Sequence, residues 1–399
     1  MLKGKNIILC VTGGIAAYKA AHLASSLVKL NAYIKVIMTK NATKFVTPLT
    51  FEHLTGNKCI TDIFEDTDSN EIEHIALANK ADLLIIAPAT ANICAKLAHG
   101  IADDMLTTTA LVCRCPKLIA PAMNSNMFEN PITQNNLNIL SNYGYTIIPP
   151  DYGRLACGVV GPGKLPEPDT IIDYILKAIA FKHDFKNKNI LVTAGPTREN
   201  LDPVRFITNS STGKMGYAIA KNAMLRGGNV TLITGPTSIS KPPFTKIIEV
   251  TSSKEMFEAV KLEYKSADFI FKVAAVADYT LETPYDNKVK KQKGDLNITF
   301  KPTRDILKYL GENRVSNQFI CGFSMETENT VENSKKKLIS KNIDMICANN
   351  LKTQGAGFQV DTNVVTIITK TNIEELPIMS KETLANSILD RALSIKENK

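Results

Sequence analysis

The chain opens with the stretch Gly4-Lys5-Asn6-Ile7-Ile8-Leu9-Cys10-Val11-Thr12-Gly13-Gly14, in which an unbroken apolar run ends in a threonine and two glycines. A helical pattern follows over Ile15–Leu30. This order is typical of a strand that is buried on both faces of a parallel sheet and turns tightly into a helix. Near the middle of the chain the pattern recurs in Asn187-Lys188-Asn189-Ile190-Leu191-Val192-Thr193-Ala194-Gly195-Pro196. The recurrence predicts two α/β domains, each started by its own strand.

Each half continues as alternating strands and helices, which predicts two Rossmann-like domains with mainly parallel sheets. The expected strands of the first half are Ile34–Met38, Leu83–Ala87, Lys117–Ala120 and Tyr145–Ile148. Those of the second half are Val230–Thr234, Phe269–Ala274, Phe319–Phe323, Met345–Ala348 and a hairpin-like pair around Phe358 and Val364–Thr369. Expected helices include Asn92–Leu97 and Lys381–Ile395, and a flexible loop or ribbon is expected at Thr280–Phe300. We expect domains at 1–180 and 189–399, joined by a lysine-rich linker at 181–188.

The composition is that of a folded protein, with 399 residues of which 44% are hydrophobic and 22% charged. This length suggests two or three domains. No apolar run reaches the roughly 18 residues of a membrane helix, and Met1–Lys5 leads into the first strand rather than into a signal peptide. We therefore expect a cytoplasmic protein. Its eight cysteines include no CxxC pair, and Cys113-x-Cys115 is a poor zinc signal, so at least six should be reduced core residues.

The formal net charge of +8 belongs to the second half of the chain. Residues 1–180 contain 15 basic and 15 acidic side chains, so the whole excess lies in residues 181–399. A basic half beside a neutral half indicates that the second half binds anions. Because the motifs of that half suit small phosphorylated molecules, nucleic acid is not the expected partner.

Three segments of the first half follow expected strands, at the edge where open parallel sheets bind ligands. Thr12-Gly13-Gly14 would let the backbone approach a phosphate at a helix N-terminus, although a tight turn without ligand explains the glycines about as well. Ala87-Pro88-Ala89-Thr90-Ala91-Asn92 and Pro121-Ala122-Met123-Asn124 offer room and hydrogen bonds for a flat polar ring. The alternative for both is a helix start capped by threonine or asparagine.

Two further side chains of the first half are candidates for chemistry. His74 precedes an apolar helical segment, where an ordinary surface or core histidine is the simpler interpretation. Cys157 lies in the glycine-rich stretch between Gly153 and Gly163, which has no strong periodicity. A core position explains this cysteine less well than the others, so it is a candidate proton donor or nucleophile.

The first half resembles the flavin-dependent cysteine decarboxylases, and phosphopantothenoylcysteine decarboxylase in particular. Five motifs in the family's order carry the resemblance: Thr12-Gly13-Gly14-Ile15-Ala16-Ala17-Tyr18-Lys19, His74, Ala87-Pro88-Ala89-Thr90-Ala91-Asn92, Pro121-Ala122-Met123-Asn124 with Met127, and Ala156-Cys157-Gly158. The resemblance implies a flavodoxin-like domain that binds FMN. The implied FMN contacts are Gly13, Gly14, Thr39, Thr90 and Asn92.

The resemblance also implies a redox-neutral decarboxylation. Flavin oxidises the carbon that bears the substrate thiol, the neighbouring carboxylate is lost, and reduced flavin returns the hydride. His74 would assist the oxidation and orient the substrate, and Asn124 would hold the substrate carboxylate beside Met127. Cys157 would supply the closing proton. Relatives without this cysteine stop at the oxidised ene-thiol, so its presence implies the full cycle.

The second half has its own candidate anion sites. Val204-Arg205-Phe206-Ile207-Thr208-Asn209-Ser210-Ser211-Thr212-Gly213-Lys214-Met215-Gly216 brings hydroxyl groups and glycines to a helix start, which suits phosphate, but it lacks the GK[ST] order of a Walker motif. Ala274-Ala275-Val276-Ala277-Asp278-Tyr279 ends a strand with an acid. Lys288-Val289-Lys290-Lys291 follows, and Lys337 and Lys341 share a helix face. For each lysine cluster alone, a solvated surface is the simpler interpretation.

In this order, the segments resemble the bacterial phosphopantothenate–cysteine ligase. Gly322-Phe323-Ser324-x-Glu326-Thr327 and Ala348-Asn349 complete the pattern. Fused after a decarboxylase, they are similar to the bifunctional enzyme of coenzyme A synthesis over nearly the whole chain. The resemblance implies that CTP activates the carboxylate of 4'-phosphopantothenate as an acyl-cytidylate, that pyrophosphate leaves, and that the amine of L-cysteine then attacks. Mg2+ is expected, because the triphosphate needs its charge neutralised.

The same resemblance assigns roles in the second half. Asn209 would position the acyl intermediate, Lys288 would neutralise phosphate charge, and Arg205 would bind the phosphate of phosphopantothenate. Ala274 and Ala275 would contact the substrate. The residues matched to the CTP site are Ser211, Gly213, Gly216, Asp278, Lys288, Asp305, Ile306, Leu307, Phe323, Lys337 and Lys341.

Four positions depart from the ligase pattern. Thr212 replaces a usual serine and keeps the hydroxyl group. Lys272-Val273 stands where small or apolar residues are usual, and a lysine in that strand must reach solvent or an anion. Arg304 replaces a usual proline and Asn350 a usual aspartate. These departures bear on cytosine recognition more than on the reaction.

Two other functions stay open at the level of sequence. A flavin or NAD oxidoreductase of two Rossmann-like domains would give no role to Cys157 or to the basic second half. A regulatory binding protein, as some decarboxylase relatives are, would not need His74, Asn124 and Cys157 together. The resemblance further implies a homo-oligomer, a dodecamer of trimeric flavin domains and dimeric ligase domains, with no membrane partner.

Overall fold

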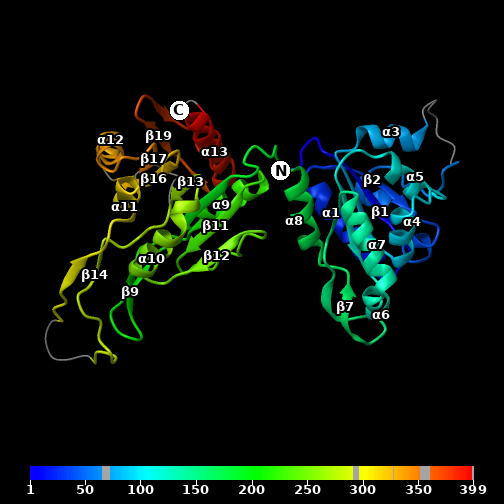
Figure 1. Ribbon diagram of the computed structural model, residues 1–399, viewed down its shortest axis with the longest axis horizontal. Coiled ribbons are helices and arrows are strands. Elements are labelled where there is room, and N and C mark those ends of the chain that lie inside the picture. The colour runs from blue at the N-terminus through cyan, green and yellow to red at the C-terminus, as the bar shows by residue number, and fades with distance from the viewer. Residues whose placement is uncertain (65–71, 291–295, 327, 351–359, 398–399) are drawn as a thin grey trace. The chain divides into compact units, whose positions relative to one another are not determined.

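A computed structural model of the chain describes residues 1–64, 72–290, 296–326, 328–350 and 360–397. The chain divides into two compact units, Met1–Lys182 and His183–Lys399, and each is considered by itself. Each has a mainly parallel sheet with helices packed on it (Figure 1), which confirms the predicted fold class. Within the described ranges, no helix combines the length and the apolar character needed to cross a membrane.

The first unit is built on a five-stranded parallel sheet with the order β2-β1-β3-β4-β5, which is the flavodoxin-like order of doubly wound folds. Its strands are β1 (Asn6–Val11), β2 (Tyr33–Met38), β3 (Leu83–Ala89), β4 (Lys117–Pro121) and β5 (Tyr145–Ile147), with a separate antiparallel hairpin of β6 (Asp151–Arg154) and β7 (Val160–Lys164). Its helices are α1 (Ala17–Lys29), α2 (Pro48–Thr55), α3 (Glu73–Lys80), α4 (Ala91–Ala98), α5 (Met105–Val112), α6 (Ser125–Glu129), α7 (Pro131–Asn142) and α8 (Pro168–Ile179), with a 3-10 turn at Ala42–Lys44.

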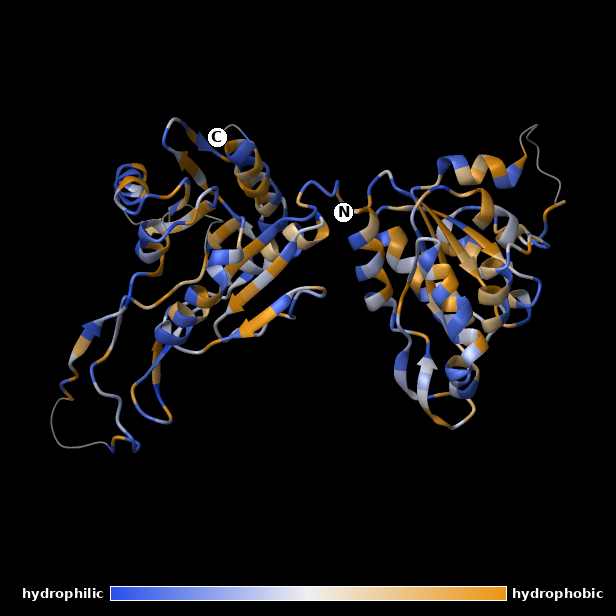
Figure 2. Ribbon diagram, viewed as in Figure 1, coloured by the Kyte–Doolittle hydropathy of each residue, from blue (hydrophilic) through white to orange (hydrophobic). Residues whose placement is uncertain are grey.

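Both faces of this sheet are covered because its strands are apolar on both faces. Ile8, Cys10, Leu84 and Ile86 pack in one cluster with side chains from α3, α4, α5 and α7. Helices α1 and α8 pack together on the opposite face. Figure 2 shows the strands between these layers mostly in the hydrophobic colour. The unbroken apolar runs therefore predict the parallel sheet correctly.

The second unit has an eight-stranded sheet with the order β12-β11-β8-β13-β16-β17-β19-β20. Its first six strands are parallel, and counted along the chain they follow the Rossmann order 3-2-1-4-5-6. The strands are β8 (Asn189–Ala194), β9 (Arg198–Asn200), β10 (Phe206–Thr208), β11 (Asn229–Thr234), β12 (Lys246–Glu249), β13 (Phe269–Lys272), β14 (Tyr279–Leu281), β15 (Phe300–Pro302), β16 (Phe319–Glu326), β17 (Met345–Asn350), β18 (Thr362–Asn363), β19 (Thr366–Thr369), β20 (Ile373–Glu375) and β21 (Met379–Ser380). The helices are α9 (Lys214–Leu225), α10 (Ser253–Glu263), α11 (Ile306–Glu312), α12 (Thr330–Ser340) and α13 (Lys381–Glu397), with a 3-10 turn at Tyr264–Ser266.

Two expected features of the second half take a different form. Phe358 lies outside the described residues, and β19 pairs antiparallel with β17 and with β20. The segment expected as a loop or ribbon is bounded by β14 and β15, which pair antiparallel. Residues 291–295 of that segment, among them Lys291, lie outside the described residues.

In the first unit, the two strands that flank the reversal of strand order are joined at both ends. At one end the Asp82 carboxylate accepts a hydrogen bond from the Asn6 N–H at 2.8 Å, and the Asp82 N–H donates to the Asn6 carbonyl at 2.8 Å. At the other end the buried Thr12 hydroxyl donates to the Pro88 carbonyl at 2.7 Å and accepts from the Thr90 N–H at 3.2 Å. These bonds fix where the loops after β1 and β3 begin.

The second unit repeats this arrangement with its own residues. The Asp268 carboxylate accepts from the Asn189 N–H at 2.8 Å, and the Asp268 N–H donates to the Asn189 carbonyl at 2.8 Å. The buried Thr193 hydroxyl accepts from the N–H groups of Val273 and Ala274, each at 3.2 Å. The similar stretches that open each half of the sequence thus serve the same structural purpose.

Replacing Thr12 by valine should destabilise the first unit by about 1–3 kcal/mol, because two buried backbone groups lose their partner while the volume is kept. Chemical denaturation of the full chain, followed by circular dichroism, measures the effect. Thr12→Ser, which keeps the hydroxyl group, is the matched control and should stay closer to the parent protein. Equal stability of Thr12→Val and the parent would contradict this role of the hydroxyl group.

Candidate functional site

The first unit has a pocket of about 430 Å³ beyond the carboxyl ends of β1, β3 and β4, where the strand order reverses. This volume lies in the range of about 300–1,000 Å³ that is usual for small-molecule sites. Six predicted site residues line it together: Gly13, Gly14, Thr90, Asn124, Met127 and Cys157. Small residues such as Pro88, Ala91 and Ala122 also line it and leave room for a flat ring system.

The two glycines after β1 have different reasons to be glycine. A Cβ atom added to Gly13 would lie 2.5 Å from the Cβ of Asn41, so the close packing of the chain alone excludes a side chain there. A Cβ added to Gly14 would meet only Thr90 Cγ2, at 3.8 Å, so space is left toward the pocket. Helix α1 begins next to Gly14, and no side chain of the described residues caps it. A free helix N-terminus of this kind favours an anion such as phosphate.

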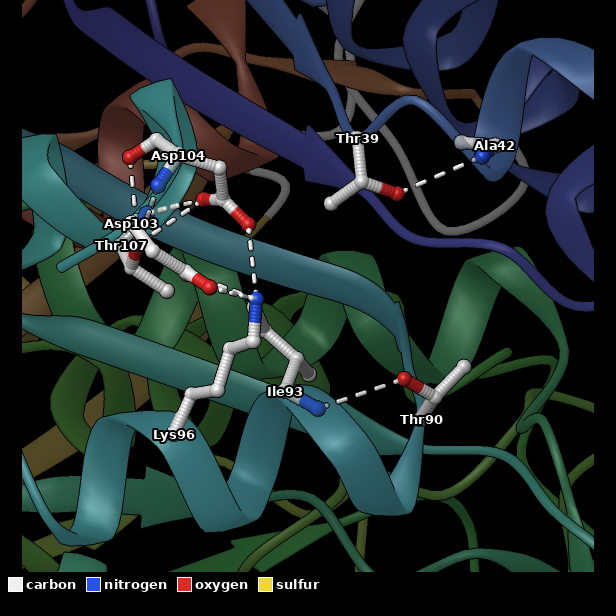
Figure 3. A network of polar contacts seen from close by, with 8 residues as sticks. All are labelled: Thr39, Ala42, Thr90, Ile93, Lys96, Asp103, Asp104 and Thr107. Carbon is white, nitrogen blue, oxygen red and sulfur yellow. Dashed lines mark hydrogen bonds and ion pairs between the residues drawn. The ribbon is translucent and has the colours of Figure 1, made fainter. Parts of the chain in front are cut away.

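Thr39 and Thr90 each bond a backbone N–H (Figure 3). The Thr90 hydroxyl accepts from the Ile93 N–H at 3.4 Å and caps α4, so the predicted cap and a place in the pocket coexist. The Thr39 hydroxyl accepts from the Ala42 N–H at 3.3 Å at the end of β2. Among the described residues that line the pocket, neither Thr39 nor the exposed Asn92 occurs. Their contacts with a flavin stay predictions.

Asn124 and Cys157 meet at one side of the pocket. Asn124 caps α6 by accepting from the Asn126 N–H at 2.9 Å, and its amide nitrogen donates to the Cys157 sulfur at 3.3 Å. Hydrogen bonds from the Val159 backbone N–H and then from Asn124 lower the pKa of the Cys157 thiol below its ordinary value. Cys157 is exposed, whereas six of the other cysteines are buried, as predicted for core residues.

His74 lies in the first turn of α3 and is not one of the described residues that line this pocket. The sequence patterns also missed three basic residues of the lining, Lys19, Arg154 and Lys164. Lys19 and Lys164 are ion-paired with Glu167, at 2.8 and 3.3 Å. Arg154 and Lys164 come from the β6–β7 hairpin, for which the glycine-rich stretch showed no strand periodicity.

The second unit has a smaller pocket of about 120 Å³ at the ends of β8, β13, β16 and β17. Six predicted residues line it: Ser211, Gly213, Gly216, Ala274, Ala275 and Phe323. Gly213 has a φ of 82° and starts α9, and a Cβ added to Gly216 would lie 2.6 Å from the Cβ of Ala194. Glycine at these positions provides the left-handed turn and the close approach of α9 to β8.

Asn209, Arg205 and Lys288 lie outside the described lining of this pocket. The Asn209 amide donates to the Ala275 carbonyl at 3.0 Å, which holds Asn209 at the end of β13. The Arg205 guanidinium is bound to the buried Asp202 carboxylate at 2.6 and 3.0 Å and to the Val289 carbonyl at 3.0 Å. Arg205 therefore anchors the loop that carries the exposed Lys288, and its contact with a substrate phosphate stays a prediction.

Four residues matched to the nucleotide site gather instead around Lys272. Burial lowers the pKa of Lys272 to about 8; Asp305 and Asp278 oppose this shift, and Lys341 and Lys337 add to it. The Lys272 ammonium donates to the Ala274 carbonyl at 3.0 Å. Three ammonium groups and two carboxylates leave this cluster with a net positive charge, which suits an anion. The lysine that departs from the ligase pattern thus lies with the predicted nucleotide residues.

The first turn of α11 supports this lysine cluster. The Asp305 carboxylate accepts from the Lys308 N–H at 3.0 Å as the N-cap and pairs with Lys341 at 2.8 Å. Ile306 and Leu307 are buried in the core, so their predicted nucleotide contacts would come from the backbone. Arg304 pairs with Glu258 at 3.1 Å.

Comparisons with known proteins agree with the two-part organisation. A family model described as Flavoprotein matches residues 1–180, and one described as DNA/pantothenate metabolism flavoprotein C-terminal domain matches residues 185–395. The chain is 48% identical over 401 residues to the coenzyme A biosynthesis bifunctional protein CoaBC of Bacillus subtilis (strain 168), covering 100% of this chain and 98% of that protein. It is 44% identical to the protein of the same name from Borreliella burgdorferi, covering 98% of this chain and 99% of that one.

A solved structure is similar to the second unit. The crystal structure of the C-terminal domain of coenzyme A biosynthesis bifunctional protein CoaBC is 40% identical to this chain, with a TM-score of 0.46. The match covers 54% of this chain and 98% of that structure.

Lys272→Met should stabilise the second unit at pH 7 and lose this advantage as the pH approaches 10. The folded protein releases the Lys272 proton at about pH 8, whereas the unfolded chain holds it to about pH 10.5, so the parent protein gains stability over this window. Melting temperatures of the parent and the variant across the range measure the difference. Lys308→Met, which removes an exposed lysine, is the control and should show no such trend. A gain for Lys272→Met that is the same at pH 7 and pH 10 would contradict the burial of a charged lysine.

Proposed function

The chain belongs to the family of coenzyme A biosynthesis bifunctional proteins, and we propose that its two units catalyse consecutive steps on small phosphorylated substrates. The second unit would join L-cysteine to 4'-phosphopantothenate at the expense of CTP. The first unit would decarboxylate the product, 4'-phosphopantothenoylcysteine, to 4'-phosphopantetheine. The protein is a bifunctional lyase and ligase. The observation that carries the proposal is that each unit gathers its predicted residues where its own strand order reverses.

The residues of the first pocket fit FMN. The opening at Gly14 and the start of α1 would hold the phosphate, and Thr90 with the small residues around it would lie along the ring system. When bound, FMN takes up a hydride from the thiol-bearing carbon of the substrate and later returns it. The remaining chemistry falls to side chains of the protein.

Asn124 and Cys157 would divide that chemistry between them. The Asn124 amide suits the substrate carboxylate before it leaves as carbon dioxide, and Met127 would cover the substrate beside it. Because the Cys157 sulfur lies 3.3 Å from that amide, it is placed to protonate the carbon next to the departed carboxylate. Its lowered pKa makes the thiol a readier proton donor.

His74 would act from a second copy of the chain. Since His74 is not among the described residues that line the pocket of its own chain, a role in the oxidation requires that it reach the flavin site of another copy. This supports the proposed homo-oligomer, with a dodecamer as the form that the resemblance implies. The proposed location is the cytoplasm, with neither nucleic acid nor membrane as a partner.

In the second unit, positive charge would stabilise the triphosphate as pyrophosphate leaves. Lys272, Lys337 and Lys341 would act from the lysine cluster, and Lys288 from the loop anchored by Arg205. Asn209, held at Ala275, would position the activated acid for attack by the amine of L-cysteine. The part of the chain that the structure describes has no group of three or more His, Cys, Asp or Glu suited to a metal. Mg2+ would therefore be bound mainly through the phosphates of CTP.

Cys157→Ser should still remove the carboxylate but accumulate an oxidised ene-thiol, two hydrogen atoms lighter than the saturated thiol. A serine hydroxyl is a far weaker acid than a thiol and cannot supply the closing proton. Mass analysis of the product from 4'-phosphopantothenoylcysteine measures this, with Cys115→Ser as the control because Cys115 lies outside the described lining of the pocket. Release of the saturated thiol by Cys157→Ser at the parent rate would refute the proposed role.

A further inference from the structure

Lys381 is a buried lysine that no motif assigned. It is the first residue of α13, its exposed fraction is 6%, and it lines the small pocket of the second unit. Its ammonium donates to the Val360 carbonyl at 2.5 Å, and its N–H donates to the Asp361 carbonyl at 2.9 Å. A buried ammonium group is costly unless its surroundings compensate the charge. Its place in the pocket therefore suggests a purpose other than support of the helix.

The charges around Lys381 favour an anion in this pocket. Burial and then Lys214 lower the pKa of Lys381, and only Asp361 is named with them as an opposing charge among the described groups. Asp361 already pairs with Lys214 at 2.7 Å, and its side chain is 87% exposed. Two ammonium groups therefore share one carboxylate that faces solvent.

Helix α9 adds a second anion-binding feature to the same pocket. Its 12 residues begin after Gly213, and the described residues include no side chain that caps it. The hydroxyl-bearing residues Ser211 and Thr212 line the pocket next to this helix start. The buried Asn349 Oδ1 has no hydrogen-bond partner among the described residues, so it can accept a bond from a ligand donor. The pocket thus suits a ligand that carries both a phosphate and a hydroxyl or amide donor.

The pocket is separate from the lysine cluster around Lys272. The charges that act on Lys272 are those of Asp305, Lys341, Asp278 and Lys337, and they do not include Lys381 or Lys214. With about 120 Å³, the pocket has room for a phosphate group rather than for a whole nucleotide. Because the proposed ligation holds two phosphorylated substrates at once, it needs two anion sites.

We propose that Lys381, with Lys214 and the N-terminus of α9, forms a phosphate subsite for one of the two phosphorylated substrates of the second unit. This inference rests on the proposed function and extends it to a residue of the C-terminal helix. The phosphate belongs either to CTP or to 4'-phosphopantothenate, and the two sources differ in which KM depends on Lys381.

Steady-state ligation by the full chain tests the subsite, with KM measured separately for each phosphorylated substrate. Lys381→Met should raise one of the two KM values about tenfold or more and change kcat much less, because a charge-assisted hydrogen bond to the phosphate is lost. Lys381→Arg should recover much of the affinity. Lys221→Met is the matched control, since Lys221 pairs with Glu382 at 3.4 Å between the same two helices and lies outside the described lining of the pocket.

A purely structural role of Lys381 gives a different result. Lys381→Met would then lower the melting temperature or kcat and leave both KM values unchanged, which would overturn the proposal. If Lys381→Met does not fold, Lys214→Gln decides, because Lys214 is partly exposed and must raise the same KM if the subsite exists. If the parent protein does not carry out the ligation, the proposed function fails, and calorimetric binding of inorganic pyrophosphate to the parent and to Lys214→Gln still tests the subsite.

Discussion

A buried threonine at the end of the first strand of each unit holds the strand across the reversal of strand order. Thr12 bonds Pro88 and Thr90, and Thr193 bonds Val273 and Ala274. At the other end of the same strand pairs, Asp82 and Asp268 exchange hydrogen bonds with the backbone of Asn6 and Asn189. Because both ends are joined, the loops that follow these strands start from fixed positions. The helix after each first strand, α1 or α9, then begins at the reversal with no side-chain cap from the described residues. Each unit therefore presents a helix N-terminus and a small-residue turn to a phosphorylated ligand.

The two sites differ in what the rest of each unit adds to this common base. In the first unit the β6–β7 hairpin carries the loop that places Cys157 beside Asn124, which brings an acidic thiol to a carboxylate-binding amide. In the second unit α11 and α12 bring Asp305, Lys337 and Lys341 around Lys272, and α13 brings Lys381 to the pocket at α9. The net charge of +8, which lies wholly in the second half, reflects this division. The first unit relies mainly on turns and a helix N-terminus for its phosphate, whereas the second adds lysines for a triphosphate and a phosphorylated acid.

Much of this arrangement follows from the sequence because parallel strands leave a simple signal. The apolar runs predict β1, β3, β8 and β13, and the residues just after such strands must meet at one edge of the sheet, so Gly14, Thr90, Asn124 and Ala274 could be placed in advance. The partners of long side chains could not. Arg205 is held by the buried Asp202, Lys272 by groups from two distant helices, and Gly13 is excluded from larger residues by Asn41, and none of these contacts has a periodic pattern. Arg154 and Lys381 were missed because the short strands that carry or precede them show no alternation. The role of His74 depends on a second copy and lies beyond what one chain can place.

The most direct test of two consecutive sites in one chain is a single incubation of the purified protein with 4'-phosphopantothenate, L-cysteine, CTP and Mg2+, followed by mass analysis of every product. The predicted result is pyrophosphate, CMP, carbon dioxide and 4'-phosphopantetheine, with 4'-phosphopantothenoylcysteine as a transient intermediate. Omission of L-cysteine should leave the acyl-cytidylate and no decarboxylated product. A preparation that contains FMN and forms neither pyrophosphate nor 4'-phosphopantetheine would contradict the assignment of both sites.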